Sequence, residues 1–218
     1  MVDFFTYDEL INDIKKMQTN KDGKTIILYA SNADEQDSYI KAAENKGYKV
    51  LLLDSPIVSH LIQKLESNKE NISFSRVDSD SIDNLIKKDD NTISKLDDKE
   101  KEKLKAYLED VISKEKYTIQ LEALDSKELP FIITQPEFMR RMKEMQQTGG
   151  GAMGNLPDMY SLIVNTNHEL VGKILNTRTE KKRNSLIKQS IDLAKLSQNN
   201  LTGKDLTEFI NRSIDLIK

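Results

Sequence analysis

The 218-residue sequence contains no cysteine and no tryptophan. The lack of cysteine excludes disulfides, thiolate metal sites and cysteine nucleophiles. No apolar stretch approaches the roughly 20 residues that a bilayer crossing requires, and the first residues lack the basic and apolar regions of a signal peptide. These absences, together with many charged residues, predict a cytoplasmic protein with no membrane partner.

Aromatic residues are also few, at 6%, and hydrophobic residues make up 37% of the chain against 32% for charged residues. The usual charged share is about 25%, so we expect a modest core beneath a densely charged surface. Lys and Arg together number 33 and Asp and Glu 36, which gives a net charge of −3. This balance argues against a dedicated nucleic-acid-binding protein, which normally has a basic face.

Strand and helix patterns alternate through residues 1–88. Three segments are predicted to form strands. Lys24–Ala30 is a near-continuous apolar run, which indicates burial on both faces as in a parallel sheet, Tyr48–Leu53 is a second buried strand, and Ile72–Val77 is a third strand. Three amphipathic segments predict helices between them: Thr6–Met17, Asp34–Lys46 and Pro56–Glu66. Thr6 and Glu9 have the spacing of a capping box. The alternation predicts a small three-layer α/β unit with right-handed crossovers.

The composition changes at Asp78–Glu102, where Asp, Ser, Lys and Asn dominate. We interpret this segment as a hinge or linker. A helix is predicted after it, to about Ser113, with Leu104, Leu108, Val111 and Ile112 on its inner side. Residues 89–115 are therefore assigned to a charged linker and connecting helix.

Residues 116–218 are predicted to form a second, mixed α/β domain. Its expected strands are Tyr117–Leu124, Phe131–Thr134 and Met159–Asn165. Its expected helices are Pro136–Gln147, His168–Leu175, Thr179–Gln198 and Lys204–Ile217. The fold class is thus α+β or α/β, with a helical hairpin at the end of the chain.

No convincing catalytic site or metal site emerges from the residues. The glycine-rich run 149–154 follows a helix and lacks the lysine of a phosphate-binding loop, so we predict a connector. The turn at Ser31–Asp34 occupies the position where doubly wound folds bind ligands, but it contains no glycine. His60 and His168 each lack a neighbouring ligand at metal spacing, so packing or capping is the simpler role.

A methionine-rich helix is the first candidate interaction surface. Phe138, Met142 and Met145 follow helical spacing, with Met139 beside them. Methionine is flexible and polarizable, and it is common at adaptable binding surfaces. The pattern fits either a helix that faces the core or an apolar strip for unfolded or varied partners.

The two terminal helices carry broad apolar stripes and form the second candidate surface; Leu193 and Leu196 also lie on the stripe of the first of them. A hairpin with such width often pairs with a second hairpin across a two-fold axis to form a four-helix bundle. The pattern equally allows both helices to pack on their own domain. The predicted dimer-interface residues are Leu186, Ile187, Ile191, Ala194, Leu206, Phe209, Ile210, Ile214 and Ile217.

Several segments, in this order, resemble the bacterial ninety-kilodalton heat-shock protein family, the HtpG chaperones. Those similar to the second half of that family's middle domain are Thr6–Leu10, Ile27–Ser31, Tyr48–Asp54 and Phe74–Asp80. Those similar to its C-terminal domain are Phe138–Lys143, Val164–Val171, Leu196–Gln198 and Gly203–Phe209. The resemblance covers essentially the whole chain.

The resemblance implies a fragment of a homodimeric, ATP-driven molecular chaperone of the stress response. The family's ATP site, with its Mg²⁺, and its catalytic arginine have no counterparts here. We therefore expect no enzymatic activity, no cofactor and no catalytic residue in this chain. The family dimerises through a four-helix bundle, which favours that role for the terminal hairpin. Its amphipathic helix faces unfolded clients, and it matches Phe138, Met139, Met142 and Met145.

The alternative is a free-standing dimeric adaptor or a flavodoxin-like nucleotide-binding protein. It predicts ligand binding at the Ser31–Asp34 and Asp54–Pro56 turns. The glycine-rich stretch 149–154 differs from many members of the family.

Overall fold

The computed structural model describes residues 6–55, 57–88, 92–142, 159–198 and 200–217, with the backbone alone for 216 and 217. The chain divides into two compact units, Met1–Asn91 and Thr92–Lys218. Each unit has a hydrophobic cluster of its own. Among the described residues, no helix combines the length and the apolar composition that a membrane crossing requires.

As the sequence predicted, the first unit is built on a three-stranded parallel sheet, and the structure gives the strand order β2-β1-β3. The strands are β1 (Thr25–Ala30), β2 (Val50–Leu52) and β3 (Ile72–Arg76). The central strand β1 is buried at every position, because both of its faces are covered. The helices are α1 (Tyr7–Ile14), α2 (Asp37–Asn45), α3 (Val58–Asn68) and α4 (Ile82–Leu85).

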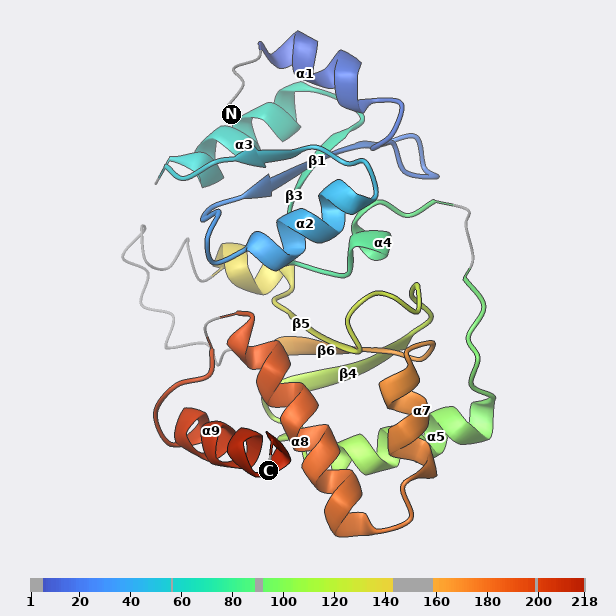
Figure 1. Cartoon of the computed structure of the whole chain (residues 1–218). Coiled ribbons are helices and arrows are strands. Elements are labelled where there is room, and N and C mark those ends of the chain that lie inside the picture. Colours follow the sequence, from blue (N-terminus) through green and yellow to red (C-terminus); the bar gives the residue numbers. More distant parts are fainter. Residues whose placement is uncertain (1–5, 56, 89–91, 143–158, 199, 218) are drawn as a thin grey trace. The chain divides into compact units, whose positions relative to one another are not determined.

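The helices cover both faces of this sheet and complete the predicted three layers. On one face, Leu10 and Ile14 of α1 and Ile62 of α3 pack with the strand residues Ile27 and Phe74. Helix α2 lies on the opposite face (Figure 1). The predicted capping box at the start of α1 is confirmed: the backbone N–H of Thr6 donates to Glu9 Oε2 at 2.8 Å, and the Glu9 N–H donates to Thr6 Oγ1.

Strand β2 differs from the prediction of a second buried strand. The strand order places β2 at one edge of the sheet, and Leu52 at its end is 50% exposed. The apolar run Val50–Leu53 resembles that of β1 in composition, but an edge strand has a neighbour on one side only. Apolar composition therefore did not distinguish the edge from the centre.

The polar segment from Asp78 was interpreted as a hinge or linker, although the predicted α/β unit runs to residue 88, and the part up to Asn91 belongs to the first unit. Ser81 accepts a hydrogen bond from the Asn84 N–H and caps α4, and Ile82, Leu85 and Ile86 are buried. The guanidinium of Arg76 contacts the Asp78 carboxylate, with 2.9 Å between Nη2 and Oδ2. The linker interpretation was wrong here, because three apolar residues at helical spacing outweigh the polar composition around them.

The second unit contains a mixed three-stranded sheet in the order β4-β6-β5. Strands β4 (Tyr117–Glu122) and β6 (Tyr160–Asn165) are parallel, whereas β5 (Phe131–Thr134) runs antiparallel to β6. The helices are α5 (Asp98–Glu109), α7 (Glu169–Asn176), α8 (Glu180–Leu196) and α9 (Gly203–Ile217). Residues 137–142 form a further helical segment.

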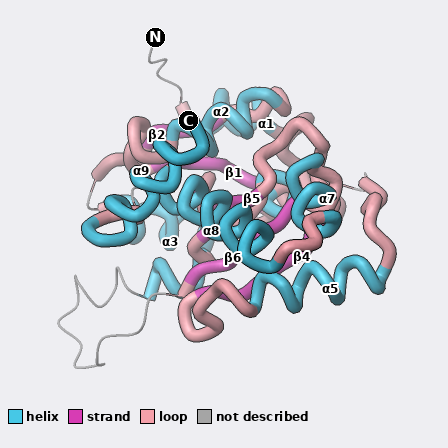
Figure 2. The backbone as a smooth tube through the Cα atoms, turned by 60° about the horizontal axis from the view of Figure 1, so that its bottom comes forward, coloured by secondary structure: helices cyan, strands magenta, loops and turns pink. Residues whose placement is uncertain are grey.

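Helices α5, α7 and α8 gather on one face of this sheet (Figures 1 and 2). The helix predicted as a connector is α5, and its Leu104 and Leu108 are fully buried in the core of the second unit. The other core residues come from the sheet and from α7 and α8: Phe131, Ile133, Leu162, Val164, Val171, Ile174, Leu175, Ile187, Ile191 and Ala194.

A buried polar cluster after β6 holds the chain where it enters the second unit. Asn167 Oδ1 accepts from the Lys95 N–H at 2.7 Å, and its Nδ2 donates to the carbonyl oxygens of Ile93 and Leu124. Asn165 Oδ1 accepts from the Leu124 N–H. Buried amides are stable only when such partners are present, so this cluster fixes the path that leads into α5.

Candidate interaction surfaces

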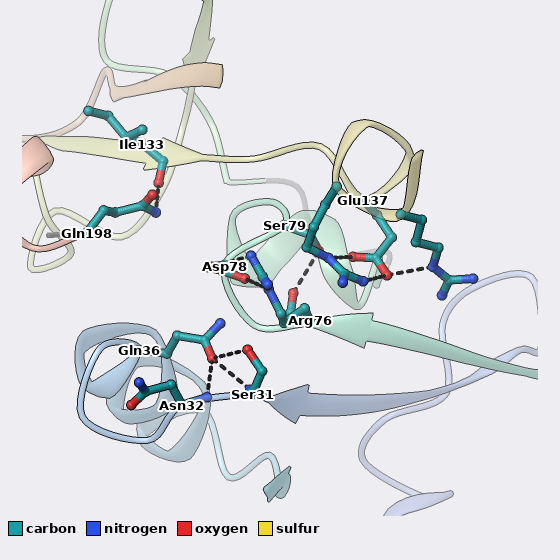
Figure 3. A network of polar contacts seen from close by, with 11 residues as sticks. Ser31, Asn32, Gln36, Arg76, Asp78, Ser79, Ile133, Glu137 and Gln198 are labelled. Carbon is teal, nitrogen blue, oxygen red and sulfur yellow. Dashed lines mark hydrogen bonds and ion pairs between the residues drawn. The ribbon is translucent and has the colours of Figure 1, made fainter. Parts of the chain in front are cut away.

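The turn between β1 and α2 is the place where the alternative function predicts a ligand. Gln36 Oε1 accepts hydrogen bonds from the backbone N–H of Ser31 at 2.8 Å and of Asn32 at 3.0 Å (Figure 3). Asn32 Oδ1 in turn accepts from the N–H groups of Asp34 and Glu35. A phosphate needs such N–H groups for itself. Because this turn uses them internally, its residues do not fit a nucleotide phosphate.

The other predicted ligand turn and the two histidines also lack the features of a site. Asp54 and Ser55 are exposed, and Pro56 lies outside the described residues. His60 is exposed on α3, whereas His168 Nδ1 accepts from the Leu170 N–H at 3.0 Å and caps α7. Within the described part of the chain, no group of three His, Asp or Glu side chains could hold a metal ion.

The methionine-rich helix is described for residues 137–142. Phe138 is 70% exposed, and Met139 and Met142 are half-buried. Met145 and the glycine-rich run 149–154 lie outside the described residues. Among the predicted apolar positions that are described here, Phe138 is therefore the most accessible to a partner.

Ion pairs within this helical segment hold its polar side together. The Glu137 carboxylate pairs with Arg140 and with Arg141, where Nε lies 2.8 Å from Oε1 (Figure 3). Burial alone would raise the pKa of the Glu137 carboxyl, but the hydrogen bonds and positive charges of the two arginines outweigh it and lower this pKa. The side chain of Phe138 takes no part in these ion pairs.

The terminal hairpin divides its predicted interface residues between two environments. Ile187, Ile191 and Ala194 of α8 are buried against the sheet of their own unit, with Leu186 partly buried beside them. These side chains are covered without a partner chain, so the structure differs from the prediction for them. Helix α8 packs against β5, so its buried stripe faces the sheet.

Helix α9 presents the opposite case. Phe209 is buried and Leu206 half-buried, but Ile210 and Ile214 are 48% and 47% exposed. The side chain of Ile217 lies outside the described residues. On α8, Leu193 and Leu196 are 51% and 42% exposed. We name Leu193, Leu196, Ile210 and Ile214 the exposed aliphatic surface of the hairpin.

Sequence reasoning placed Leu193 and Leu196 on the apolar stripe of α8 but left them out of the predicted interface. Both lie on the side of the helix away from Ile187, Ile191 and Ala194. Once Ile187, Ile191 and Ala194 are known to face the sheet, a helical projection places Leu193 and Leu196 on the exposed side. The sequence alone does not indicate which side of the apolar stripe meets the sheet.

An open pocket of about 510 Å³ lies at the base of the hairpin, between the end of α5, the start of β4, and α8 and α9. Three lysines, Lys116, Lys188 and Lys195, and two carboxylates, Asp192 and Asp205, line it together with Tyr117. Burial raises the pKa of Tyr117, and the negative charges of Asp192 and Asp205 raise it further. Lys195 contacts both carboxylates, and the lining contains no paired nucleophile and base.

No family model matches the chain. Among curated proteins, the chain is similar to the chaperone protein HtpG of Bacteroides thetaiotaomicron, at 34% identity over 98% of this chain and 41% of that protein. It is also similar to the chaperone protein HtpG of Bacteroides fragilis, at 33% identity over 98% of this chain and 41% of that protein. With the chaperone protein HtpG of Porphyromonas gingivalis it shares 38% identity over 88% of this chain and 29% of that protein.

The chain thus spans about two fifths or less of the length of these curated relatives. The aligned region in the Bacteroides thetaiotaomicron protein extends over 282 positions, more than the 218 residues of this chain. That relative therefore carries residues inside the matched region that have no counterpart here.

Proposed function

Because the chain belongs to the HtpG chaperone family, we propose that it is part of a molecular chaperone that forms homodimers and contacts unfolded or partly folded client proteins in the cytoplasm. In this proposal, ATP and Mg²⁺ bind in a part of the family's protein that this chain does not contain.

The observation that carries the dimer is the exposed aliphatic surface of the hairpin. Its four side chains, Leu193, Leu196, Ile210 and Ile214, lie on two helices that contact each other. Each is already about half covered, so burying the rest contributes about 0.7–1.5 kcal/mol per side chain before ordering costs. A second copy presents the same surface across a two-fold axis, which gives the four-helix bundle.

Sedimentation equilibrium over a range of concentrations tests the dimer. We expect the unaltered chain to dimerise and a variant with Ile210→Ser and Ile214→Ser to sediment as a monomer. The matched control carries Thr207→Ser and Asn211→Ser, two exposed positions of the same helix. A dimer that survives the isoleucine changes would show that this surface does not join the two copies.

Client binding is proposed for the helical segment 137–142. Phe138 stands out from a helix whose polar side is paired internally, and two methionines flank it half-buried. A few such side chains support weak, reversible holding rather than tight recognition, because each contributes only about 1.5–3 kcal/mol. Methionine beside phenylalanine also adapts to clients of varied shape.

Light scattering by a heat-unfolded client, with and without the chain, tests this role. We expect Phe138→Ser with Met142→Ser to weaken the suppression of aggregation while the dimer persists. Leu129→Ser is the control, because Leu129 is a 52% exposed apolar residue of the same unit outside this helix. Equal losses in both variants would assign capture to general surface hydrophobicity instead.

A further inference from the structure

Helix α8 carries one buried carboxylate, and it faces α9. Asp192 is 2% exposed, although it lies between the core residue Ile191 and the exposed Leu193. It pairs with the Nη2 group of Arg212, and the Nζ of Lys195 lies 3.4 Å from its Oδ1. A buried carboxylate is strongly destabilising without such partners. Its position therefore holds Arg212, and with it α9, in one orientation.

Further polar contacts continue along the two helices. The Gln189 amide donates to Ser213 Oγ at 2.9 Å and accepts from Arg212 Nε at 3.3 Å. Lys195 also lies 3.5 Å from the carboxylate of Asp205. We name Gln189, Asp192, Lys195, Asp205, Arg212 and Ser213 the α8–α9 seam. At the exposed side of the seam, Lys188 pairs with Glu208 at 2.8 Å.

Apolar burial alone does not specify which face of α9 packs against α8. Of the side chains described on α9, Phe209 is buried, whereas Ile210 and Ile214 are exposed on the adjoining face. Each face carries at least one large apolar side chain, and hydrophobic burial has no preferred direction. Hydrogen bonds and ion pairs do have one. The seam lies on the same side of α9 as Phe209, since positions 209, 212 and 213 share a helical face.

We propose that Asp192 is a positioning residue for the dimer surface: by holding Arg212 and Lys195, it selects the inward face of α9 and keeps Ile210 and Ile214 outward. The inference rests on the proposed dimerisation. Buried polar groups are known to fix orientation in helical assemblies at some cost in stability. Here the selected outward face is the one that a second copy covers.

The absence of cysteine makes a direct test of the face possible. Single Ser213→Cys and Ile210→Cys substitutions report which face of α9 is accessible, because no other thiol reacts and Phe209 stays in place. Labelling is carried out at a concentration well below the dimer dissociation constant. We expect fast labelling at position 210 and slow labelling at the half-buried position 213, with the contrast reduced at least tenfold when Asp192→Asn is added.

The same Asp192→Asn change is expected to raise the dimer dissociation constant about tenfold, which corresponds to about 1.4 kcal/mol. Glu180→Gln is the matched control: this carboxylate also lies on α8, but it is exposed and outside the α8–α9 seam. We expect this control to change the dimer dissociation constant and the labelling contrast by less than twofold. A dimer and a labelling contrast unchanged by Asp192→Asn would overturn the inference.

A second variant covers the case in which Asp192→Asn does not fold. Asp192→Leu with Arg212→Met replaces the pair by apolar groups, which is often neutral or stabilising for a fold. We expect this variant to fold but to lose the labelling contrast and dimerise more weakly; full retention of both would refute the positioning role. If the unaltered chain stays monomeric throughout, the proposed dimer fails, while the labelling contrast still decides the role of Asp192 in selecting the face.

Discussion

Helices α8 and α9 have apolar stripes of similar width, yet they attach to the second unit in different ways. Helix α8 buries Ile187, Ile191 and Ala194 against the sheet. Among the side chains described on α9, Phe209 is buried and Leu206 half-buried, and the hydrogen bonds and ion pairs of the α8–α9 seam join this helix to α8. Helix α8 is part of the core, whereas the described part of α9 adds no residue to that core cluster. The width of an apolar stripe therefore indicates how much apolar surface is to be buried, but it does not indicate which element or partner buries it.

The largest expected effect separates the core side of the hairpin from its exposed side. Ile191→Ala removes a buried side chain and should lower the free energy of unfolding by about 2–5 kcal/mol, because a cavity remains. Ile210→Ala, at a 48% exposed position, should change it by no more than about 0.5 kcal/mol in the monomer. Urea denaturation at a concentration below dimerisation measures both values. Equal losses would mean that α9 also belongs to the core.

Phe209→Ala should produce an intermediate effect that stays local. Phe209 is the buried side chain among those described on α9, and its burial contributes about 1.5–3 kcal/mol. Its loss should therefore speed amide exchange along α9 while α8 keeps its protection, because the core beneath α8 is intact. Hydrogen exchange resolved by residue measures the difference. Matched losses of protection in both helices would show that the hairpin opens as one unit.

Much of the fold could be predicted from the sequence, because periodicity reports local structure directly. The order of helices and strands in the first unit and its parallel sheet are confirmed. The continuous apolar run of β1 indicated burial on both faces, and β1 is buried throughout. The same logic did not distinguish β2, since the position of a strand within a sheet depends on contacts with distant segments.

The candidate surfaces were less predictable for a related reason. The methionine pattern placed Phe138 on an apolar face, and its exposure could not be derived from the pattern itself. The interface residues of α8 were assigned by their hydrophobicity, but the sheet already covers them. Asp192 drew no attention in the sequence, because one carboxylate among 36 acidic residues carries no signal until its burial is known.

A smaller effect concerns the exposed edge of the seam. The hydrogen bond from Lys188 lowers the pKa of the Glu208 carboxyl, and the nearby positive charges lower it further. A lowered folded-state pKa means that the pair stabilises the hairpin fully above the ordinary value of 4.5, and that this stabilisation is lost as the pH falls through the folded-state pKa. We expect Lys188→Met to raise the pKa of Glu208 toward 4.5.

A carboxyl titration followed by NMR measures that pKa. Lys204→Met is the control, because Lys204 contacts the same carboxylate at 3.8 Å and is 87% exposed. We expect the smaller change in that variant. An unchanged Glu208 titration after Lys188→Met would contradict the contact between α8 and α9 at this edge.

The smallest expected effect is a change in the pKa of Tyr117, which senses both helices of the hairpin at once. Burial raises this pKa above 10.0, and the charges of Asp192 on α8 and Asp205 on α9 add to it. Asp192→Asn and Asp205→Asn should each lower the pKa of Tyr117, as measured by NMR of labelled tyrosine with Tyr117→Phe for assignment. Phe209→Ala should remove the contribution of Asp205 and leave that of Asp192, because only α9 is released. The structure indicates that α9 is attached less firmly than α8. This difference is contradicted if Phe209→Ala removes neither the Asp205 nor the Asp192 contribution to the pKa of Tyr117, or removes both.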